Sequence, residues 1–223
     1  MRTGWGVSFF LDGSTLFDTG ENGAWLLANM ELMNIDIKKI QSVVISHDHW
    51  DHTGGLRALL ERNPLIKVYG CPGFGNQFKQ LVAYYNAPLV EIDTMTNITG
   101  TIFSTGEVSG MYKEQPIAEQ ALVVNGDRGI AIITGCAHPG IITIVKKVKK
   151  HFPDTTIQLV IGGFHLMQTS RPSISEIIDE MKDLGVVCVG PTHCSGGDAQ
   201  EMFQMKYGEN YVPVIAGESI QFQ

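Results

Sequence analysis

The sequence predicts an α/β fold with mixed sheets, and three observations lead to this class. Stretches rich in β-branched residues alternate with stretches whose apolar residues recur at helical spacing. Hairpin signals occur near the beginning and in the middle of the chain, which a purely parallel sheet would not need. The 223 residues suffice for one large domain and show no linker or short repeat. We therefore expect a single domain over residues 1–223.

The first part of the chain alternates strands and helices around one polar motif, SHDHWDHTGG. An Asp-Gly turn predicts the opening hairpin, a β-branched run predicts the strand before the motif, and leucines at helical spacing predict the helix after it. We expect, in order, a hairpin over 7–17, a helix over 24–33, a strand over 43–46, a helix over 56–62, and strands over 66–69 and 89–92. The motif therefore lies on a crossing from strand to helix.

The second part is regular only from residue 121 onward. Residues 93–119 are polar and show no pattern that we can assign, and a loop of that length in a compact domain is usually functional or mobile. Beyond it the apolar periodicity predicts strands over 121–124 and 130–134, a helix over 141–152, a strand over 157–161, a helix over 174–184, a strand over 186–190 and a last strand near 211–215.

Composition and charge exclude several classes of partner. Sixteen basic against 23 acidic residues give a net charge of −7, so nucleic acid is not an expected partner. The lysine-rich segment 146–150 alternates with apolar residues at helical spacing, which indicates the solvated face of a helix. No run of 18 apolar residues and no targeting segment is present, so we expect no membrane association. The four cysteines have no disulfide-framework spacing, which favours a cytoplasmic protein.

Six of the seven histidines follow predicted strands. The exception is His151, at the end of a predicted helix, where it complements the helix dipole. The histidines after strands are His47, His49, His52, His138, His165 and His193. Because the loops at the ends of strands in a layered α/β fold converge on one edge, we expect a ligand-binding crevice there.

The spacing inside the polar motif suits a metal ion. His47 and His49 are two residues apart and can reach one ion together, while Asp51 and His52 lie on the turn into the next helix. Imidazoles with one carboxylate fit zinc, iron or manganese. The alternative is a helix N-terminal turn in which Asp51 is the capping residue. That alternative leaves the other strand-end histidines without a role.

The motif SHDHWDHTGG resembles the H-x-H-x-D-H signature of the metallo-β-lactamase superfamily, and LFDTG and PTHCSG resemble further segments of it. The resemblance implies an αββα four-layer sandwich of two mixed sheets flanked by helices, with two divalent metal ions. Zinc is the first expectation, with iron or manganese as alternatives. Together with STGEV, ITGCAHPGI and IGGFHL, these segments most resemble a branch that includes the archaeal dihydropterin ribofuranosylaminobenzene phosphate synthases and hydrolase-like relatives.

The resemblance assigns roles to individual residues. The implied metal ligands are His47, His49, Asp51, His52, His138 and His193. Cys136 stands where most members have a bridging aspartate, and it is either a further ligand or a small core residue. The expected catalytic residues are Asp51, which positions the attacking hydroxide, and His165, which stabilises developing charge; the alternative for His165 is that it ligates metal itself. Asp18 is expected to orient a ligand histidine, or to serve only in a turn.

The N-terminus departs from the family pattern, because relatives usually have another strand before GVSFFL. This departure leads us to expect that an N-terminal edge strand is missing and that a second subunit could cover the exposed sheet edge in a homodimer.

Three functions compete. The first is a metal-dependent hydrolase that uses a metal-bound hydroxide on a small anionic metabolite, phosphorylated or ester-containing. The second is a transferase of the pterin synthase type that releases pyrophosphate. The third is a non-catalytic metal- or ligand-binding protein, because fold alone does not determine function.

Overall fold

The computed structural model describes residues 1–221, which divide into two compact units, one from Met1 to Asp93 and the other from Thr94 onward. Each unit contains a mixed sheet with helices packed along it, so the predicted α/β class is confirmed. The expected single domain over residues 1–223 stays a prediction. In the part of the chain that the structure describes, no helix has both the length and the apolar composition needed to cross a membrane.

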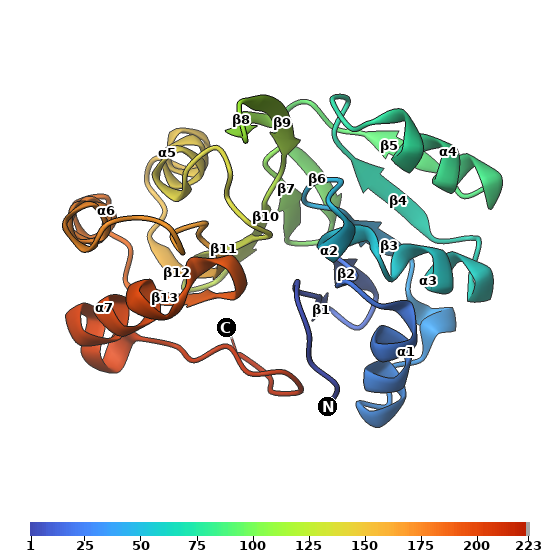
Figure 1. Ribbon diagram of the computed structural model, residues 1–223, viewed down its shortest axis with the longest axis horizontal. Helices are drawn as coiled ribbons and strands as arrows, with labels where there is room; N and C mark the ends of the chain where they lie inside the picture. The colour runs from blue at the N-terminus through green and yellow to red at the C-terminus, as the bar shows by residue number, and fades with distance from the viewer. Residues whose placement is uncertain (222–223) are drawn as a thin grey trace. The chain divides into compact units, whose positions relative to one another are not determined.

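The first unit is built on a five-stranded sheet in sequence order, β1-β2-β3-β4-β5 (Figure 1). The first two strands pair antiparallel as the predicted hairpin, and the other neighbouring strands are parallel. The strands are β1 (Phe9–Leu11), β2 (Thr15–Phe17), β3 (Ser42–Val44), β4 (Lys67–Gly70) and β5 (Leu89–Glu91). The helices are α1 (Gly23–Leu32), η1 (Ile37–Lys39), α2 (Trp50–Thr53), α3 (Leu56–Arg62) and α4 (Asn76–Tyr84).

Strand β1 lies at the edge of this sheet and has β2 as its one strand neighbour among residues 1–221. The missing edge strand and the homodimer that could cover this edge stay predictions. The predicted helix over 24–33 begins one residue earlier, because the Asn22 side chain accepts hydrogen bonds from the N–H groups of Ala24 and Trp25 and so caps α1.

The second unit is built on a six-stranded sheet in the order β13-β12-β11-β10-β7-β6, and β8 and β9 form a separate hairpin. Strands β11, β12 and β13 run parallel, and the remaining neighbours are antiparallel. The strands are β6 (Thr96–Thr99), β7 (Ile102–Ser104), β8 (Val108–Tyr112), β9 (Gln115–Glu119), β10 (Leu122–Gly126), β11 (Gly129–Thr134), β12 (Ile157–Gly163) and β13 (Cys188–Thr192). The helices are α5 (Ile141–His151), α6 (Arg171–Asp183), α7 (Gly197–Tyr207), and the short η2 (His193–Ser195) and η3 (Gly208–Asn210).

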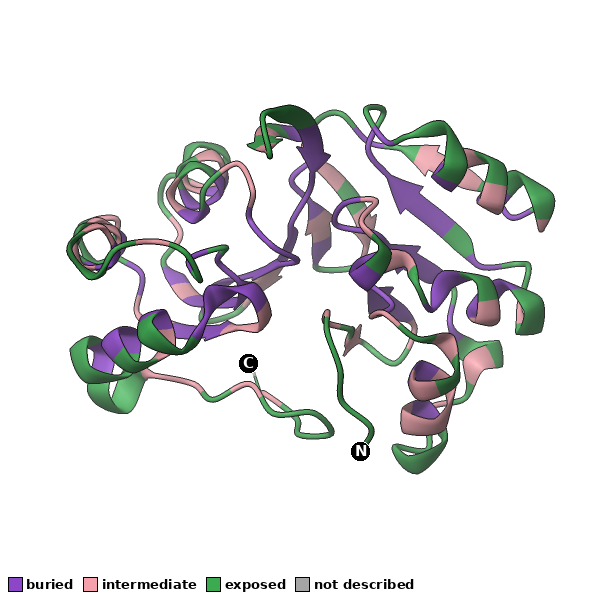
Figure 2. Cartoon of the chain, viewed as in Figure 1, coloured by how far each residue is buried: buried purple, intermediate pink, exposed green. Residues whose placement is uncertain are grey.

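The core of the second unit lies between its parallel strands and the apolar faces of its helices. Ile144, Val145 and Val148 of α5 are fully buried in one cluster with Val160 of β12 and Phe203 of α7. The lysines of α5 lie on the opposite, half-buried to exposed face, as the sequence predicts. Figure 2 shows this division, with buried strands and helices that are exposed on one side only. The parallel strands β11 and β12 are thereby covered by helices and buried along most of their length.

The expectation of a long loop over residues 93–119 is wrong, because β6, β7, β8 and β9 occupy that segment. Its strands are short antiparallel ladders with many Thr, Asn, Ser and Gln side chains, so the apolar alternation of a half-buried strand is weak. The β8–β9 hairpin turns at Lys113 and Glu114, both with positive φ (47° and 63°). Asn-Gly or Asp-Gly is the usual sequence for such a turn, so the turn signal is absent too.

The short helix α2 and the longer helices α4 and α7 were not predicted, and one predicted strand does not form. Helix α4 begins directly after a Gly-rich stretch, and α7 begins on Gly197, so neither has a recognisable N-terminal signal. The strand expected near residues 211–215 is wrong, because Tyr211 makes only an isolated bridge with Val189 in this part of the chain. The other predicted elements are confirmed to within three residues at their ends.

Candidate functional site

In the first unit, Asp18 organises the polar motif that follows β3. Its Oδ1 accepts a hydrogen bond from the Ser46 N–H at 2.7 Å, and its Oδ2 accepts one from the Ser46 hydroxyl at 2.7 Å. The same Oδ2 lies 2.6 Å from Nδ1 of His52. All three residues are fully buried. The predicted contact between Asp18 and a histidine of the motif is therefore confirmed. The carboxylate favours a proton on Nδ1, so Nε2 is the ring nitrogen that a metal ion would use.

The imidazoles of the motif gather at one place. The ring centroid of His47 lies 4.7 Å from that of His49 and 4.1 Å from that of His52. Nε2 of His52 is 3.4 Å from Oδ2 of Asp51. Two nitrogen or oxygen ligands about 2.1 Å from a tetrahedral ion lie about 3.4 Å apart, so this pair already has the spacing of two ligands of one ion.

The alternative that Asp51 caps a helix is wrong. The residue before the first turn of α2 is His49, which makes no side-chain capping hydrogen bond, and Asp51 lies inside the helix. The motif therefore has the donors of a metal site and lacks the contacts of a helix cap.

The electrostatic surroundings of His52 favour a positive charge. Burial by itself lowers the pKa of this imidazole, but attraction to Asp18, its hydrogen bond to Asp18, and the contact with Asp51 together raise the pKa to about 10. Two carboxylates thus stabilise a cation at this ring, and a divalent metal ion can take the place of the proton.

In the second unit, Glu119 at the end of β9 organises the turn that follows β11. One carboxylate oxygen accepts hydrogen bonds from the N–H groups of Cys136 (2.9 Å) and Ala137 (2.6 Å). The other oxygen lies 2.8 Å from the backbone N of His138 and 2.9 Å from its Nδ1. Burial raises the pKa of this fully buried carboxyl, but the hydrogen bonds from His138 and the backbone outweigh it and hold the pKa below its usual range.

Sequence reasoning did not identify Glu119. A charged residue inside the apolar stretch IAEQALVV is a usable signal, because a buried carboxylate requires partners. That signal carries weight only once β9 is recognised as a buried strand.

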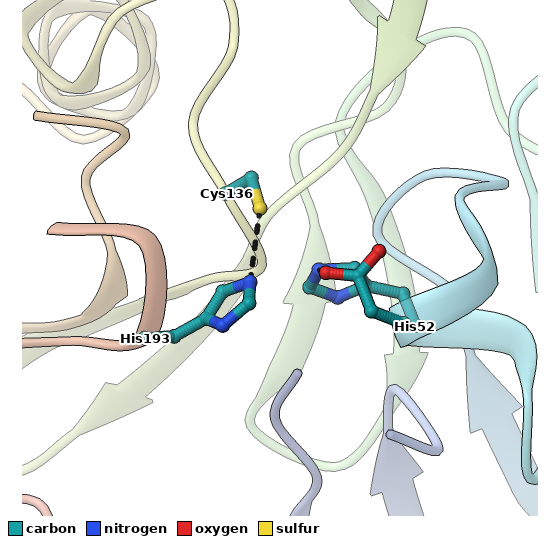
Figure 3. A group of neighbouring side chains, drawn as sticks. His52, Cys136 and His193 are labelled. Atoms are coloured by element: carbon teal, nitrogen blue, oxygen red, sulfur yellow. Dashed lines mark hydrogen bonds and ion pairs between the residues drawn. The ribbon is translucent and has the colours of Figure 1, made fainter. Parts of the chain in front are cut away.

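The thiol of Cys136 faces the ring of His193, which follows β13 (Figure 3). Cys136 Sγ and His193 Nε2 are 3.3 Å apart. A sulfur and a nitrogen bound to one tetrahedral zinc ion lie about 3.5 Å apart, so the pair is placed as two ligands of one ion would be.

Two histidines of the second unit, His138 and His165, lie close together and contact the same tyrosine ring. The rings of His138 and His165 are 4.4 Å apart between centroids. The ring of Tyr112, at the end of β8, lies roughly perpendicular to both, with its centroid 5.1 Å from that of His138 and 5.9 Å from that of His165. Sequence reasoning did not identify Tyr112, because it lies in the segment taken for a loop.

Cys194 adds a second thiol beside His165. The pKa of Cys194 is lowered to about 5, mainly by its hydrogen bond with Cys136 and, against the opposing effect of burial, by His165 and the charge of His193. The hydrogen bond between Cys194 and His165 in turn raises the pKa of the His165 imidazole.

The structure therefore brings the predicted site residues together in two groups, one in each unit. The group of the first unit comprises His47, His49, Asp51 and His52, and that of the second unit comprises Cys136, His138, His165 and His193. Their roles as metal ligands or catalytic residues stay predictions.

A family model for the metallo-β-lactamase superfamily matches residues 6–220. The chain belongs to this superfamily. It is 31% identical over 269 aligned residues to the 7,8-dihydropterin-6-methyl-4-(β-D-ribofuranosyl)-aminobenzene-5′-phosphate synthase of Methanocaldococcus jannaschii, and the match covers 97% of this chain and 90% of that protein.

Two solved structures of the superfamily resemble this chain. One, described as a metal-dependent hydrolase of the β-lactamase superfamily, has a TM-score of 0.82 and 29% identity and covers 99% of this chain and 93% of its own. The metallo-β-lactamase fold protein YhfI of Bacillus subtilis has a TM-score of 0.65 and 14% identity and covers 95% and 89%. The metallo-β-lactamase fold with its mixed sheets and flanking helices, predicted from the sequence, is thereby confirmed.

Membership of the metallo-β-lactamase superfamily implies that divalent metal is bound, and the donors of both groups fit this chemistry. Imidazole, carboxylate and thiolate are the ligand types that zinc takes in proteins. Each group also contains a histidine whose Nδ1 is held by a buried carboxylate, which is the usual support of a metal-binding imidazole.

Proposed function

We propose that the protein is a metal-dependent hydrolase that acts on a small anionic metabolite with a phosphate or ester group. The observation that carries this proposal is the chain of contacts Asp18–His52–Asp51, in which one carboxylate orients the imidazole and the other lies at ligand spacing from its Nε2. The proposed ligands of two divalent ions, zinc first, are His47, His49, Asp51, His52, His138 and His193, with Cys136 as a further candidate. Family membership supports the joint use of both groups.

When bound, two such ions lower the pKa of a water molecule and polarise a carbonyl or phosphoryl oxygen. The residues of this chain supply the geometry and the proton transfers. Asp18 and Glu119 each hold an Nδ1 proton and so present Nε2 of His52 and His138 as ligand atoms. Asp51 offers a carboxylate oxygen that can accept the proton of the attacking water.

Transferase chemistry is the second candidate, and one observation favours it. The match to the archaeal pterin phosphate synthase covers nearly the whole of both chains at 31% identity. A transferase of this type would join a pterin pyrophosphate to an aryl amine and release pyrophosphate, with the amine in the place of water.

Metal analysis and one pair of variants test the hydrolase proposal. Purified protein should contain about two divalent ions per chain, and His49→Ala should lose metal and activity together. His151→Ala is the matched control, because His151 lies exposed at the end of α5. Full activity of the His49→Ala variant would refute the proposal.

The reaction class is decided by the requirement for the amine. Pyrophosphate release from a dihydropterin pyrophosphate is measured with and without the aryl amine. Release that depends on the amine identifies a transferase, whereas turnover of phosphorylated or ester substrates in water identifies a hydrolase.

A further inference from the structure

Two thiols and an imidazole meet in the second unit, at the turns that follow β11, β12 and β13. The Sγ atoms of Cys136 and Cys194 and a ring nitrogen of His165 all lie within 4.8 Å of one another. Cys194 Sγ is 3.6 Å from the carbonyl oxygen of Cys136, and it also hydrogen-bonds with His165. Three side chains of types that bind soft metals therefore lie close together, and Cys194 and His165 lie outside the set of ligands proposed above.

The backbone at this place is shaped to bring the three side chains together. Each of the three turns holds a non-glycine residue in the left-handed region: Ala137 (φ 62°), His165 (φ 52°) and His193 (φ 52°). Such conformations are strained for residues other than glycine and concentrate at functional sites. A Cβ on Gly163 would lie 2.7 Å from Cys194 Sγ, so the glycine leaves the room that this thiol occupies.

The spacing is close to that of ligands on one ion. Sulfur and nitrogen ligands of a tetrahedral zinc ion lie about 3.5–3.8 Å apart. The three ligand atoms lie within 4.8 Å of one another, so side-chain rotations that shift them by about 1 Å bring them to ligand spacing. Cys136 and Cys194 are buried, which shields the thiolates from water, while His165 is exposed and leaves a route for an ion to enter.

We propose that Cys136, His165 and Cys194 form a sulfur-rich metal site that takes a thiophilic ion such as Zn²⁺ or Cd²⁺. Two thiolates and one imidazole favour soft or borderline ions over Mg²⁺ or Mn²⁺, which prefer oxygen. Three protein ligands leave a fourth position open for water or another ligand. A thiolate has several lone pairs and can bridge two ions, so Cys136 can serve this site and still contact His193. Under this assignment His165 binds metal and does not stabilise charge on the substrate.

Cadmium titration tests the proposal through the charge-transfer absorption of cadmium–thiolate bonds, which histidine and carboxylate ligands do not produce. The reduced wild-type protein should develop this band as Cd²⁺ is added. Cys194→Ser should lose about half of the band and bind Cd²⁺ at least about tenfold more weakly, since even supporting residues of metal sites contribute that much. Cys188→Ser, in β13 of the same unit, is the matched control and should titrate like the wild type.

A second variant guards against misfolding of the first. His165→Asn retains a side chain that tolerates positive φ and removes the imidazole, so it should keep both thiolates but bind Cd²⁺ about tenfold more weakly. Wild-type titration of Cys194→Ser or of His165→Asn would overturn the proposal, as would the absence of a thiolate band in the wild type. His49→Ala separates this site from the proposed function, because that variant should lose activity and keep the band.

Discussion

Replacing Glu119 by glutamine should destabilise the second unit strongly while changing only one atom of the side chain. Both oxygens of Glu119 accept two hydrogen bonds each, one from the N–H groups of Cys136 and Ala137 and the other from the backbone N–H and Nδ1 of His138. A glutamine amide has one oxygen only. With its NH₂ group toward Cys136 and Ala137 it faces two donors, and two buried hydrogen bonds are lost; with its NH₂ group toward His138 it loses the backbone bond, and it keeps the ring bond only if His138 changes tautomer.

The magnitude follows from the number and type of bonds lost. Each charge-assisted hydrogen bond contributes roughly 1.5–3 kcal/mol, so two of them amount to roughly 3–6 kcal/mol. Removing a buried charge recovers part of this, because the carboxylate of Glu119 is fully shielded from water. We expect a net loss of about 2–4 kcal/mol in the free energy of unfolding.

Urea unfolding in the presence of a chelator measures this loss without a contribution from bound metal. The midpoint of Glu119→Gln should fall by roughly 1 M with an unchanged m-value. Amide exchange at residues 136–138 should accelerate, because these N–H groups lose their acceptor. Glu114→Gln, on the exposed turn of the same β8–β9 hairpin, is the control and should change stability by less than about 0.5 kcal/mol. An unchanged midpoint together with unchanged exchange at 136–138 would refute the reasoning.

Further variants test other contacts. Thr15→Val should raise the unfolding free energy by roughly 1 kcal/mol in urea titration, because the buried Thr15 hydroxyl has no hydrogen-bond partner among residues 1–221; a lower midpoint would contradict this. Tyr207→Phe should keep or raise the melting temperature for the same reason, since its buried hydroxyl lacks a partner in the described chain; a clear decrease would reveal an unrecognised partner. Asp18→Asn should weaken metal binding about 10–100-fold in a competition assay with a chelator, because His52 loses its orienting carboxylate; wild-type affinity would count against the role of Asp18. Gly163→Ala should cost roughly 1–3 kcal/mol in thermal unfolding, since its Cβ would lie 2.2 Å from the Gly135 oxygen; wild-type stability would show that the turn can move.

The elements that the sequence predicts well are those whose burial is one-sided and regular. Helix α3 was predicted with its observed bounds, because its leucines recur at helical spacing and all face the core. Helix α7 was missed although Ala199, Met202 and Phe203 are buried, because glycines precede it and polar residues interrupt the stripe. Periodicity identifies an element only when the boundary signals agree with it.

The candidate site was predicted as far as strand ends could be recognised. Histidines after β3, β11, β12 and β13 were found because those strands are apolar and continuous. Glu119 and Tyr112 were missed because β8 and β9 are polar and turn at Lys113 and Glu114. The contact of Glu119 with a histidine 19 residues away follows from the placement of β9, which no local pattern specifies.

The two buried carboxylate–histidine pairs show how much of a site can be inferred once burial is known. Asp18 follows β2 and holds His52, and Glu119 ends β9 and holds His138, so each unit contains one such pair. Both carboxylates are fully buried, and a buried carboxylate without a partner is too costly to persist. Each pair favours a proton on Nδ1, so the Nε2 atoms would need no change of tautomer to bind a metal ion. The acids that bind no metal themselves are therefore as informative about the site as the histidines, and a buried acid at a strand end predicts a supported ligand nearby.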